Sequence, residues 1–237
     1  MKNLYLGDSQ CRMKNLLHLI IITGIMNEKK YKIIWIGDTG VGKTCLLIKA
    51  LKNLFEKENK STLGFEYYDI TIKLKNNKKI LLQTWDTCGQ ESYKSIANIF
   101  YKRVKLAILV YSIDNRDSFE GLNYWLKEIR SKSQEDVKLI LVGNKSDLDS
   151  KREVSYADGK SFYESQKFDY FLEASAKEGD TPYSILRKAA EILYKDSKEK
   201  EGKKEEKSDN NYDSESFSLE EHKDLKQNNF DSCDNCI

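Results

Sequence analysis

Short apolar runs alternate along this chain with longer segments of mixed polarity. The runs have the length of β-strands and the segments between them read as helices, so the alternation favours successive βαβ units. Strands are predicted at residues 32–37, 65–74, 80–85, 105–111, 137–143 and 168–173. Helices are predicted at residues 45–54, 92–102, 118–133, 156–166 and 182–196.

Two of the runs, residues 107–110 and 139–142, are continuously apolar, which is typical of parallel strands buried on both faces. Residues 75–78 read as a hairpin turn between the second and third strands. A length of 237 residues with 39% hydrophobic content allows one such core with additional terminal segments. The pattern therefore predicts an α/β fold with a mostly parallel six-stranded sheet and one antiparallel strand.

Residues 37–44 follow the first predicted strand, precede the first predicted helix, and fit the pattern G-x-x-x-x-G-K-[ST]. Glycines in such a loop let backbone N–H groups point at phosphate oxygens, beside a helix N-terminus that favours negative charge. Lys43 would reach the β- and γ-phosphates, and the Thr44 hydroxyl would bind Mg²⁺. The alternative is a glycine-rich turn with a chance lysine, and the strand–loop–helix context favours the phosphate loop.

The nucleotide base is selected further along, where Asn144, Lys145 and Asp147 directly follow the fifth predicted strand. The Asp147 carboxylate can accept two hydrogen bonds from the N1–H and the N2 amine of guanine, and adenine offers no such pair. Asn144 can tie this loop to the phosphate loop, and the stem of Lys145 can cover the base. Residues 175–177 follow another strand, and their N–H groups could bind the guanine oxygen. Alone such a loop is chemically ordinary; its place behind a phosphate loop and a strand favours guanine.

A third group, residues 85–91, begins at the last residue of the third predicted strand. The Asp86 carboxylate can hold Mg²⁺ through water, and the Gly89 N–H can bond the γ-phosphate. Gln90 can orient the attacking water. Thr62 could supply a second hydroxyl to Mg²⁺ and its carbonyl to the water. The alternative interpretations are a turn for residues 86–89 and a solvated loop for Thr62.

In this order the motifs resemble those of the Ras-superfamily small GTPases, and the resemblance covers about residues 29–197. Within that superfamily the chain looks most like the Rab branch. The Rab-like features are residues 61–65, Trp85, and residues 93–96, 110–112 and 117–119. The resemblance implies a three-layer P-loop NTPase fold with about five helices, and a monomeric enzyme that converts GTP and water to GDP and phosphate with Mg²⁺.

The resemblance also implies which residues form the site. Gln90, Thr62 and Lys43 would serve hydrolysis, while Thr44, Thr62 and, through water, Asp86 would hold Mg²⁺. The implied nucleotide contacts are Gly37, Asp38, Thr39, Gly40, Val41, Gly42, Lys43, Thr44, Cys45, Phe55, Thr62, Asp86, Gly89, Asn144, Lys145, Asp147, Ser175, Ala176 and Lys177. Phe55 would lie against the guanine face.

An aromatic triad that reads effectors in Rab proteins would correspond to Tyr67, Trp85 and Phe100, although ordinary sheet core would explain the same residues. Some positions depart from the family pattern. Thr39 stands where Ras proteins carry Gly and Rab proteins usually carry Ser, and a β-branched side chain near the γ-phosphate could slow hydrolysis. Cys88 replaces a usual Ala. None of the departures removes a nucleotide contact.

Both ends of the chain lie outside the predicted GTPase domain, residues 29–198. Residues 1–28 include an apolar run, 16–22, that is far shorter than the ~20 residues needed to span a bilayer. The run could be the core of a signal peptide, but no convincing small-residue cleavage site follows. Residues 26–29 look like a normal start for this family. We expect residues 1–28 to be either an artefact of the assigned start or a genuine extension.

Residues 199–237 are polar and are expected to form a disordered acidic tail. Six lysines and twelve acidic residues give this tail a net charge of −6, which leaves +8 for the rest of a chain of net +2. An acidic tail is mildly repelled by anionic lipid headgroups. It therefore lacks the polybasic segment that reinforces many lipid anchors.

The five scattered cysteines indicate a reducing compartment without a disulfide framework. Cys233 and Cys236 close the chain, and three interpretations compete: Rab-like prenylation of one or both, a redox or metal pair, or two exposed thiols without a role. The ending is not a C-a-a-X box, because Asp234 is the fourth residue from the end. It also differs from the common Rab endings. Two lipid chains would give stable anchoring where one gives marginal binding.

We therefore expect a GTP-hydrolysing switch of the Rab type that regulates vesicle trafficking on the cytosolic face of an intracellular membrane and cycles with the cytosol. The resemblance implies effectors at the switch face, an exchange factor, a GTPase-activating protein, prenylation and GDP-dissociation-inhibitor machinery, and no nucleic acid. One alternative is a slow or non-hydrolysing GTP-bound scaffold, which Thr39 favours. Another is a soluble Ras-like signalling GTPase without an anchor. Asn144 and Asp147 oppose an ATPase or kinase.

Overall fold

The computed structural model describes residues 29–55, 65–87, 101–133 and 136–209. Six strands form one sheet in the order β2-β3-β1-β4-β5-β6. The strands are β1 (Lys30–Ile36), β2 (Phe65–Lys73), β3 (Lys79–Thr87), β4 (Leu106–Ser112), β5 (Lys138–Asn144) and β6 (Tyr170–Glu173). Only the β2–β3 pair is antiparallel, and its register runs from Phe65↔Thr87 to Lys73↔Lys79. The other four pairs are parallel, which confirms the predicted sheet.

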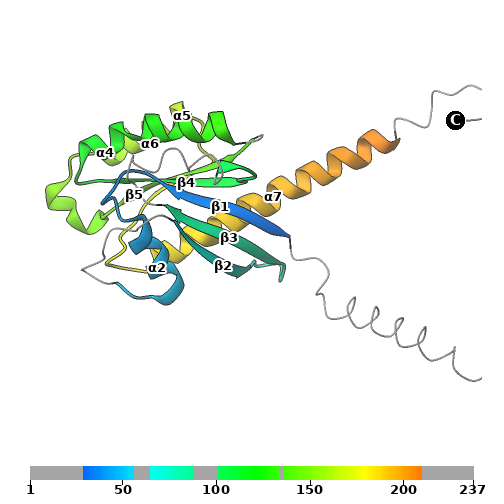
Figure 1. Cartoon of the computed structure of the whole chain (residues 1–237), viewed down its shortest axis with the longest axis horizontal. Coiled ribbons are helices and arrows are strands. Elements are labelled where there is room, and N and C mark those ends of the chain that lie inside the picture. Colours follow the sequence, from blue (N-terminus) through cyan, green and yellow to red (C-terminus); the bar gives the residue numbers. More distant parts are fainter. Residues whose placement is uncertain (1–28, 56–64, 88–100, 134–135, 210–237) are drawn as a thin grey trace, which may run out of the picture. The chain divides into compact units, whose positions relative to one another are not determined.

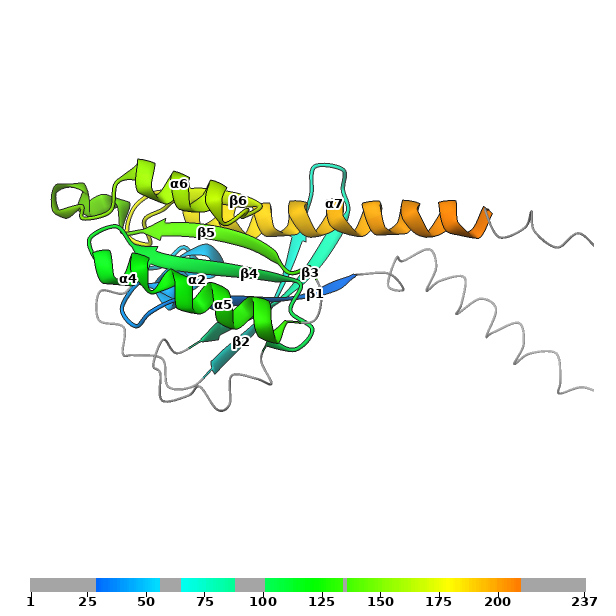
Figure 2. The same cartoon turned by 90° about the horizontal axis from the view of Figure 1, so that it is seen from above.

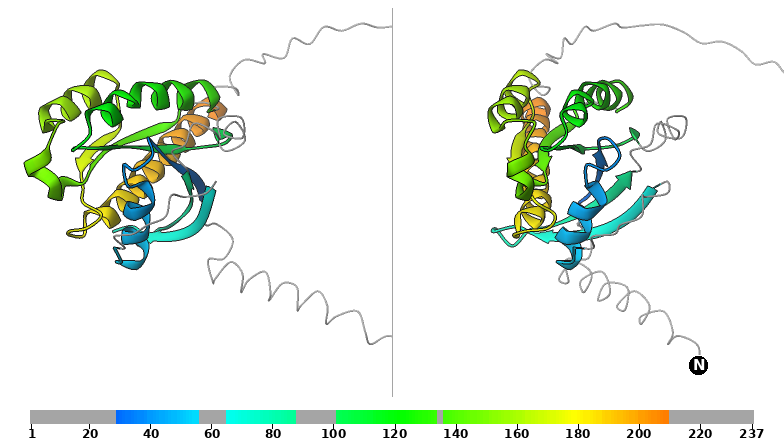
Figure 3. Two further views of the ribbon diagram at one scale, coloured as in Figure 1. Left: turned by 60° about the vertical axis from the view of Figure 1, so that its left-hand side comes forward. Right: turned by 90° about the vertical axis from the view of Figure 1, so that its left-hand side faces the viewer.

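Helices cover both faces of the sheet (Figures 1 and 3). The described α-helices are α2 (Lys43–Lys52), α4 (Arg116–Glu120), α5 (Leu122–Lys132), α6 (Tyr156–Ser165) and α7 (Thr181–Asp209). Side chains from α2 and α7 pack in one core cluster with Ile33 and Trp35. Side chains from α5 and α6 pack in a second cluster with Ile34 and Ile36. Because neighbouring strand residues point to opposite faces, β1 supplies both cores, and the three-layer α/β fold is confirmed.

The prediction of one continuous helix over residues 118–133 is wrong, because the structure has two helices there, α4 and α5, separated at Gly121. Asn115 caps α4, and its side-chain oxygen accepts a hydrogen bond from the Ser118 N–H at 2.9 Å. A Cβ on Gly121 would lie only 2.6 Å from Oδ2 of Asp38. The chain therefore has a residue without a side chain where α4 and α5 meet the phosphate loop.

The last helix is longer than predicted. Helix α7 ends at Asp209, so it continues from Glu199 through residues for which the sequence predicts disorder. Lysine and glutamate are good helix formers, which accounts for the extension. Residues up to Lys198 and residues from Glu199 belong to two separate compact units. Among the described residues no helix has the length and apolarity needed to cross a bilayer.

Because the strands are mostly parallel, the sheet has a carboxyl end and an amino end (Figure 2). The loops after β1, β4, β5 and β6 lie at the carboxyl end of the strands, where α/β sheets bind ligands. The turn between β2 and β3 and the start of β1 lie at the opposite end. In this turn Asn77 has a φ of 60° and its N–H bonds to the Leu74 carbonyl at 3.0 Å, which confirms the predicted hairpin.

Candidate guanine-nucleotide site

Residues 37–44 connect β1 to α2 as a tight loop. Gly37 and Gly42 have φ values of 144° and 92°, in the region that side-chain-bearing residues rarely adopt. A Cβ on Gly37 would lie 2.2 Å from the Val110 carbonyl oxygen, and one on Gly42 would lie 2.3 Å from Nδ2 of Asn144. Glycine is therefore required at both positions, where the loop touches β4 and β5.

Lys43 is held inside this loop. Its side chain is buried, with 5% of the residue exposed, and Nζ donates hydrogen bonds to the carbonyls of Gly37 and Asp38, each at 2.8 Å. Two backbone carbonyls that accept hydrogen bonds from one ammonium group fix its position. This geometry suits a lysine that binds phosphate oxygens beside the loop.

Asp86 and Thr44 form the second part of the phosphate side. The Thr44 hydroxyl donates to Oδ2 of Asp86 at 2.5 Å, and Asp86 is fully buried. The other oxygen, Oδ1, has no hydrogen-bond donor among the described residues. Burial raises the pKa of Asp86 to about 6, against the opposing effects of the Thr44 hydrogen bond and the Lys43 charge. A buried carboxylate oxygen without a donor is costly unless a cation compensates it.

This arrangement fits Mg²⁺. Magnesium is usually bound by one or two carboxylates or hydroxyls together with substrate phosphates and water, rather than by a full protein cage. The described residues contain no group of three or more His, Cys, Asp or Glu placed to hold a metal. Thr44 and Asp86 are the described residues that would hold the ion.

Asn144 joins three loops of the site. Its Nδ2 donates to the Val41 carbonyl of the phosphate loop at 2.7 Å, and its Oδ1 accepts from the Ala176 N–H at 3.3 Å. The side chain is almost fully buried. Lys145 follows with a φ of 65°, and its Nζ lies 3.4 Å from Oδ1 of Asp114. The tie between the two loops has the form that the sequence predicts for Asn144.

Asp147 is fixed by the loop after β6. Its Oδ1 accepts a hydrogen bond from the Ser175 hydroxyl at 2.6 Å, and its Oδ2 lies 3.8 Å from Nζ of Lys177. Ser175 Oγ in turn accepts from the N–H groups of Lys177 and Glu178, at 3.1 and 3.0 Å. Only 8% of the Asp147 side chain is exposed. The carboxylate is thus oriented before any guanine contact is made.

Three further predicted residues lie at the rim of the site or beyond it. Phe55 follows α2 and is 40% exposed, so its ring is available to a ligand. Tyr67 is 44% exposed on β2, and its ring centroid lies 5.0 Å from that of Trp85. Nζ of Lys32 stands 5.0 Å above the Trp85 ring. The exposure of Tyr67 shows that it is not ordinary sheet core.

Several predicted functional residues lie outside the described part of the chain. They are Thr62, Gly89, Gln90, Phe100, Cys88, Cys233 and Cys236, together with most of the helix predicted at residues 92–102. Their assigned roles stay predictions.

The structure adds two features that sequence reasoning missed. Residues Ser146–Lys151 form a short 3-10 helix, η2, that contains Asp147. Trp125 on α5 donates from Nε1 to Oδ1 of Asp38 at 2.7 Å, and only 8% of Trp125 is exposed. Asp38 and Trp125 are 87 residues apart, and no local pattern connects them. The indole therefore ties the phosphate loop to the helix layer in a way that only the fold reveals.

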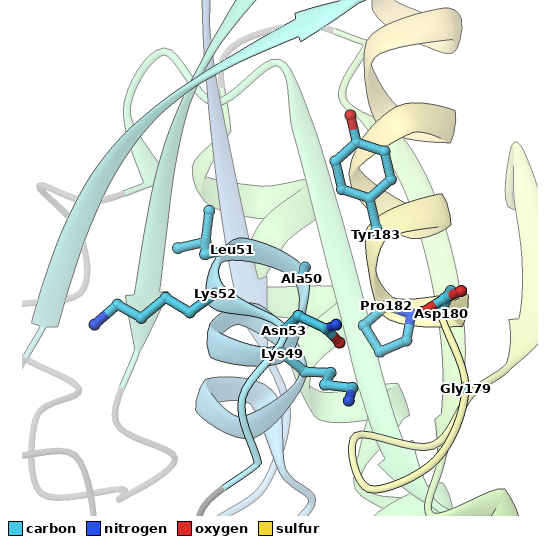
Figure 4. Close-up of a pocket in the computed structure, with 9 residues that line it drawn as sticks. All are labelled: Lys49, Ala50, Leu51, Lys52, Asn53, Gly179, Asp180, Pro182 and Tyr183. Carbon is cyan, nitrogen blue, oxygen red and sulfur yellow. The ribbon is translucent and has the colours of Figure 1, made fainter.

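A separate cavity of about 470 Å³ lies between the end of α2 and the start of α7 (Figure 4). Its walls come from Lys49, Leu51 and Lys52 on one side and from Pro182 and Tyr183 on the other. None of the predicted nucleotide contacts lines it. The nucleotide site is therefore defined by the loops described above rather than by this cavity.

Comparisons with known proteins agree with this geometry. A family model described as the Ras family matches residues 32–195. The chain is 43% identical over 163 residues to "Ras-related protein Rab-11B" of Dictyostelium discoideum, covering 69% of this chain and 73% of that protein. It is 39% identical over 168 residues to "Ras-related protein Rab-2B" of the same organism, covering 71% and 82%. The family match spans every described loop of the site.

Proposed function

Since the chain belongs to the Ras family of small GTPases, as a Rab-like member that hydrolyses GTP to GDP and regulates vesicle trafficking, we propose specific roles for its residues. The observation that carries the proposal is the buried Asp86 oxygen that has no donor among the described residues, beside the Thr44 hydroxyl and the Lys43 ammonium. These three groups form a phosphate and magnesium site. Asp147 and Asn144 form a guanine site that is joined to it.

In the phosphate site, Lys43 binds the β- and γ-phosphates, and the N–H groups of residues 37–44 surround them. Thr44 and Asp86 would hold Mg²⁺, which when bound would supply positive charge to the phosphate oxygens. By family resemblance Gln90 orients the attacking water and Thr62 adds a further ligand. Water forms a bond to the γ-phosphorus while the bond between that phosphorus and the β,γ-bridging oxygen breaks, which yields GDP and phosphate.

In the guanine site, the Asp147 carboxylate accepts the N1–H and N2 protons of the base. The Ser175 hydroxyl keeps this carboxylate in place, and a backbone N–H of residues 175–177 is the proposed donor to the base oxygen. The Lys145 stem and the Phe55 ring cover the two faces of the base. An adenine in this pocket would leave the Asp147 carboxylate unpaired, which explains guanine selection.

The first test is chromatography of the nucleotide released from freshly purified protein that has never met EDTA. Release of GDP is the expected result for a guanine-specific enzyme that turns over its substrate. Retained GTP would instead indicate the slow scaffold, with Thr39 as the residue to replace first.

A Gln90→Leu variant should accumulate GTP relative to wild type. Equal GDP content in both proteins would contradict the role of Gln90.

We further propose that residues 29–198 are the GTPase domain, preceded by an extension and followed by an acidic tail. Tyr67, Trp85 and Phe100 form the face that effectors read, and an exchange factor, an activating protein and a GDP-dissociation inhibitor act on the domain. Prenylation of Cys233, Cys236 or both attaches the chain to the cytosolic face of an intracellular membrane. Intact-mass analysis of protein from its own cells tests this point, because an unmodified mass would favour the soluble signalling alternative.

A further inference from the structure

The end of the sheet opposite the nucleotide loops carries a concentration of positive charge that GTP hydrolysis does not use. Residues 73–79 contain four lysines, residues 102–105 contain two lysines and one arginine, and neither segment contains Asp or Glu. We call these two segments together the basic edge. The first is the end of β2, the hairpin turn and the start of β3, and the second directly precedes β4.

The two segments of the basic edge lie on neighbouring strands. Strand β1 is between β3 and β4 in the sheet. Lys73 pairs with Lys79 across the β2–β3 ladder. The Lys105 N–H bonds to the Lys32 carbonyl at 2.9 Å, and Nζ of Lys32 donates to the Lys102 carbonyl at 3.2 Å. The basic edge therefore flanks the first residues of β1 on both sides and forms one surface.

The charge of the hairpin is exposed and is not neutralised by described acids. Four lysines of the hairpin are exposed to solvent: Lys73, Lys75, Lys78 and Lys79. None of these four forms an ion pair with any acid of the described ranges. By contrast, Lys138 at the start of β5 lies 3.4 Å from Asp169 and 3.7 Å from Asp196. The described acids that pair with Lys138 therefore do not neutralise the hairpin lysines.

The contact between Lys138 and Asp196 also locates the part of α7 at which the first compact unit ends. Lys138 begins β5, so Asp196 lies at the same end of the sheet as the basic edge. The chain leaves the GTPase domain at this end (Figure 2). Any anchor attached further along the chain would draw this end of the domain toward a membrane.

We propose that the basic edge docks on an anionic phospholipid surface and so directs the nucleotide loops away from it. The proposal rests on the proposed membrane attachment and adds the face that meets the lipid. Each lysine near an anionic bilayer adds to the attraction. The basic edge thus supplies the positive charge that the acidic tail lacks. The basic edge has no aromatic residue on which a nucleic-acid base could stack, which favours a lipid partner over a single-stranded nucleic acid.

The test uses the full chain without lipid, sedimented with vesicles of phosphatidylcholine alone or with added phosphatidylserine. We expect binding only to the phosphatidylserine vesicles, and we expect it to weaken as salt is raised. A triple variant, Lys75→Gln with Lys78→Gln and Lys79→Gln, should lower the partition coefficient roughly ten- to a hundredfold. The matched control is Lys127→Gln with Lys151→Gln and Lys160→Gln, which removes the same charge from exposed positions of α5, η2 and α6.

The control variant should bind vesicles nearly as well as wild type. An equal loss in both variants would show a general effect of net charge and would overturn the proposal. Binding that ignores phosphatidylserine, or capture by a single-stranded oligonucleotide but not by vesicles, would overturn it as well. Bound nucleotide content, measured on every variant, distinguishes a loss of vesicle binding from a loss of nucleotide binding. The vesicle experiment uses the unmodified chain. Intact-mass analysis of protein from its own cells therefore tests the lipid anchor independently.

Discussion

The base half and the phosphate half of the nucleotide site satisfy their polar groups differently. In the base half, Asn144, Asp147 and Ser175 are buried or nearly so, and each has hydrogen-bond partners within the protein. In the phosphate half, Oδ1 of Asp86 is buried without a described donor. Burial of the same carboxyl group raises the pKa of Asp86 to about 6.

This difference indicates that base selection is built into the folded protein, while the phosphate half gains its stability from what it binds. A preformed base half places a fixed carboxylate against guanine and rejects adenine by leaving that carboxylate unpaired. A phosphate half with a costly buried carboxylate favours the fold most when magnesium and phosphates are bound. Substitutions in the two halves should therefore change different measured quantities.

The largest effect is expected for Asp147→Asn. Loss of two hydrogen bonds to a charged acceptor should weaken GDP binding on the order of 10³-fold and shift preference toward xanthine nucleotides. Competition of GDP and XDP for the purified variant measures both effects. Asp149→Asn is the matched control in the same short helix, since its side chain is 76% exposed and paired with Arg152. Retained guanine preference in Asp147→Asn would remove the base-contact assignment.

A smaller but different effect is expected for Asp86→Asn in the phosphate half. An amide cannot supply the negative charge that supports magnesium, so magnesium affinity should fall roughly 10- to 100-fold, with guanine preference unchanged. Titration of GDP release against free Mg²⁺ measures the change. Asp69→Asn, an exposed position on β2, should leave the titration as in wild type. A shift in base preference instead would contradict the separation of the two halves.

Trp125→Phe tests whether the helix layer supports the phosphate half. The variant keeps an aromatic ring but removes the donor to Asp38, whose carbonyl also accepts from Lys43. A lost hydrogen bond to a charged group should speed GDP release roughly tenfold. Fluorescent-nucleotide release is the measurement. Asp38→Asn, which keeps an acceptor oxygen, should be milder than Asp38→Ala, and Trp125→Phe should add nothing to Asp38→Ala. Additive effects would mean that Trp125 acts only through packing.

The smallest effect is expected for Ser175→Ala in the base half. The hydroxyl holds one Asp147 oxygen and accepts from two backbone N–H groups, so its loss should speed GDP release roughly three- to tenfold. The magnesium titration should not change. The control is Ser184→Ala on the exposed side of α7, whose hydroxyl bonds, among the described residues, to the Thr181 carbonyl. Equal release rates for wild type and Ser175→Ala would show that Asp147 needs no such support.

Local patterns predicted most of the fold. The apolar runs located all six strands, and the turn residues located the β2–β3 hairpin. The break between α4 and α5 was not predicted, because its reason is the approach of Gly121 to Asp38, a contact between distant segments. The extension of α7 was missed because polar, charged composition favours disorder and exposed helix alike.

By itself the sequence determined the order of the strands and helices, the phosphate-loop and guanine motifs, and the family. These depend on residue periods and short spacings, which are local properties. Only the tertiary structure decided which groups meet outside these motifs, such as Trp125 with Asp38, 87 residues apart. It also decided that one oxygen of Asp86 is buried without a described donor. Such pairings arise when the parallel strands bring distant loops to one end of the sheet, and no local pattern encodes that encounter.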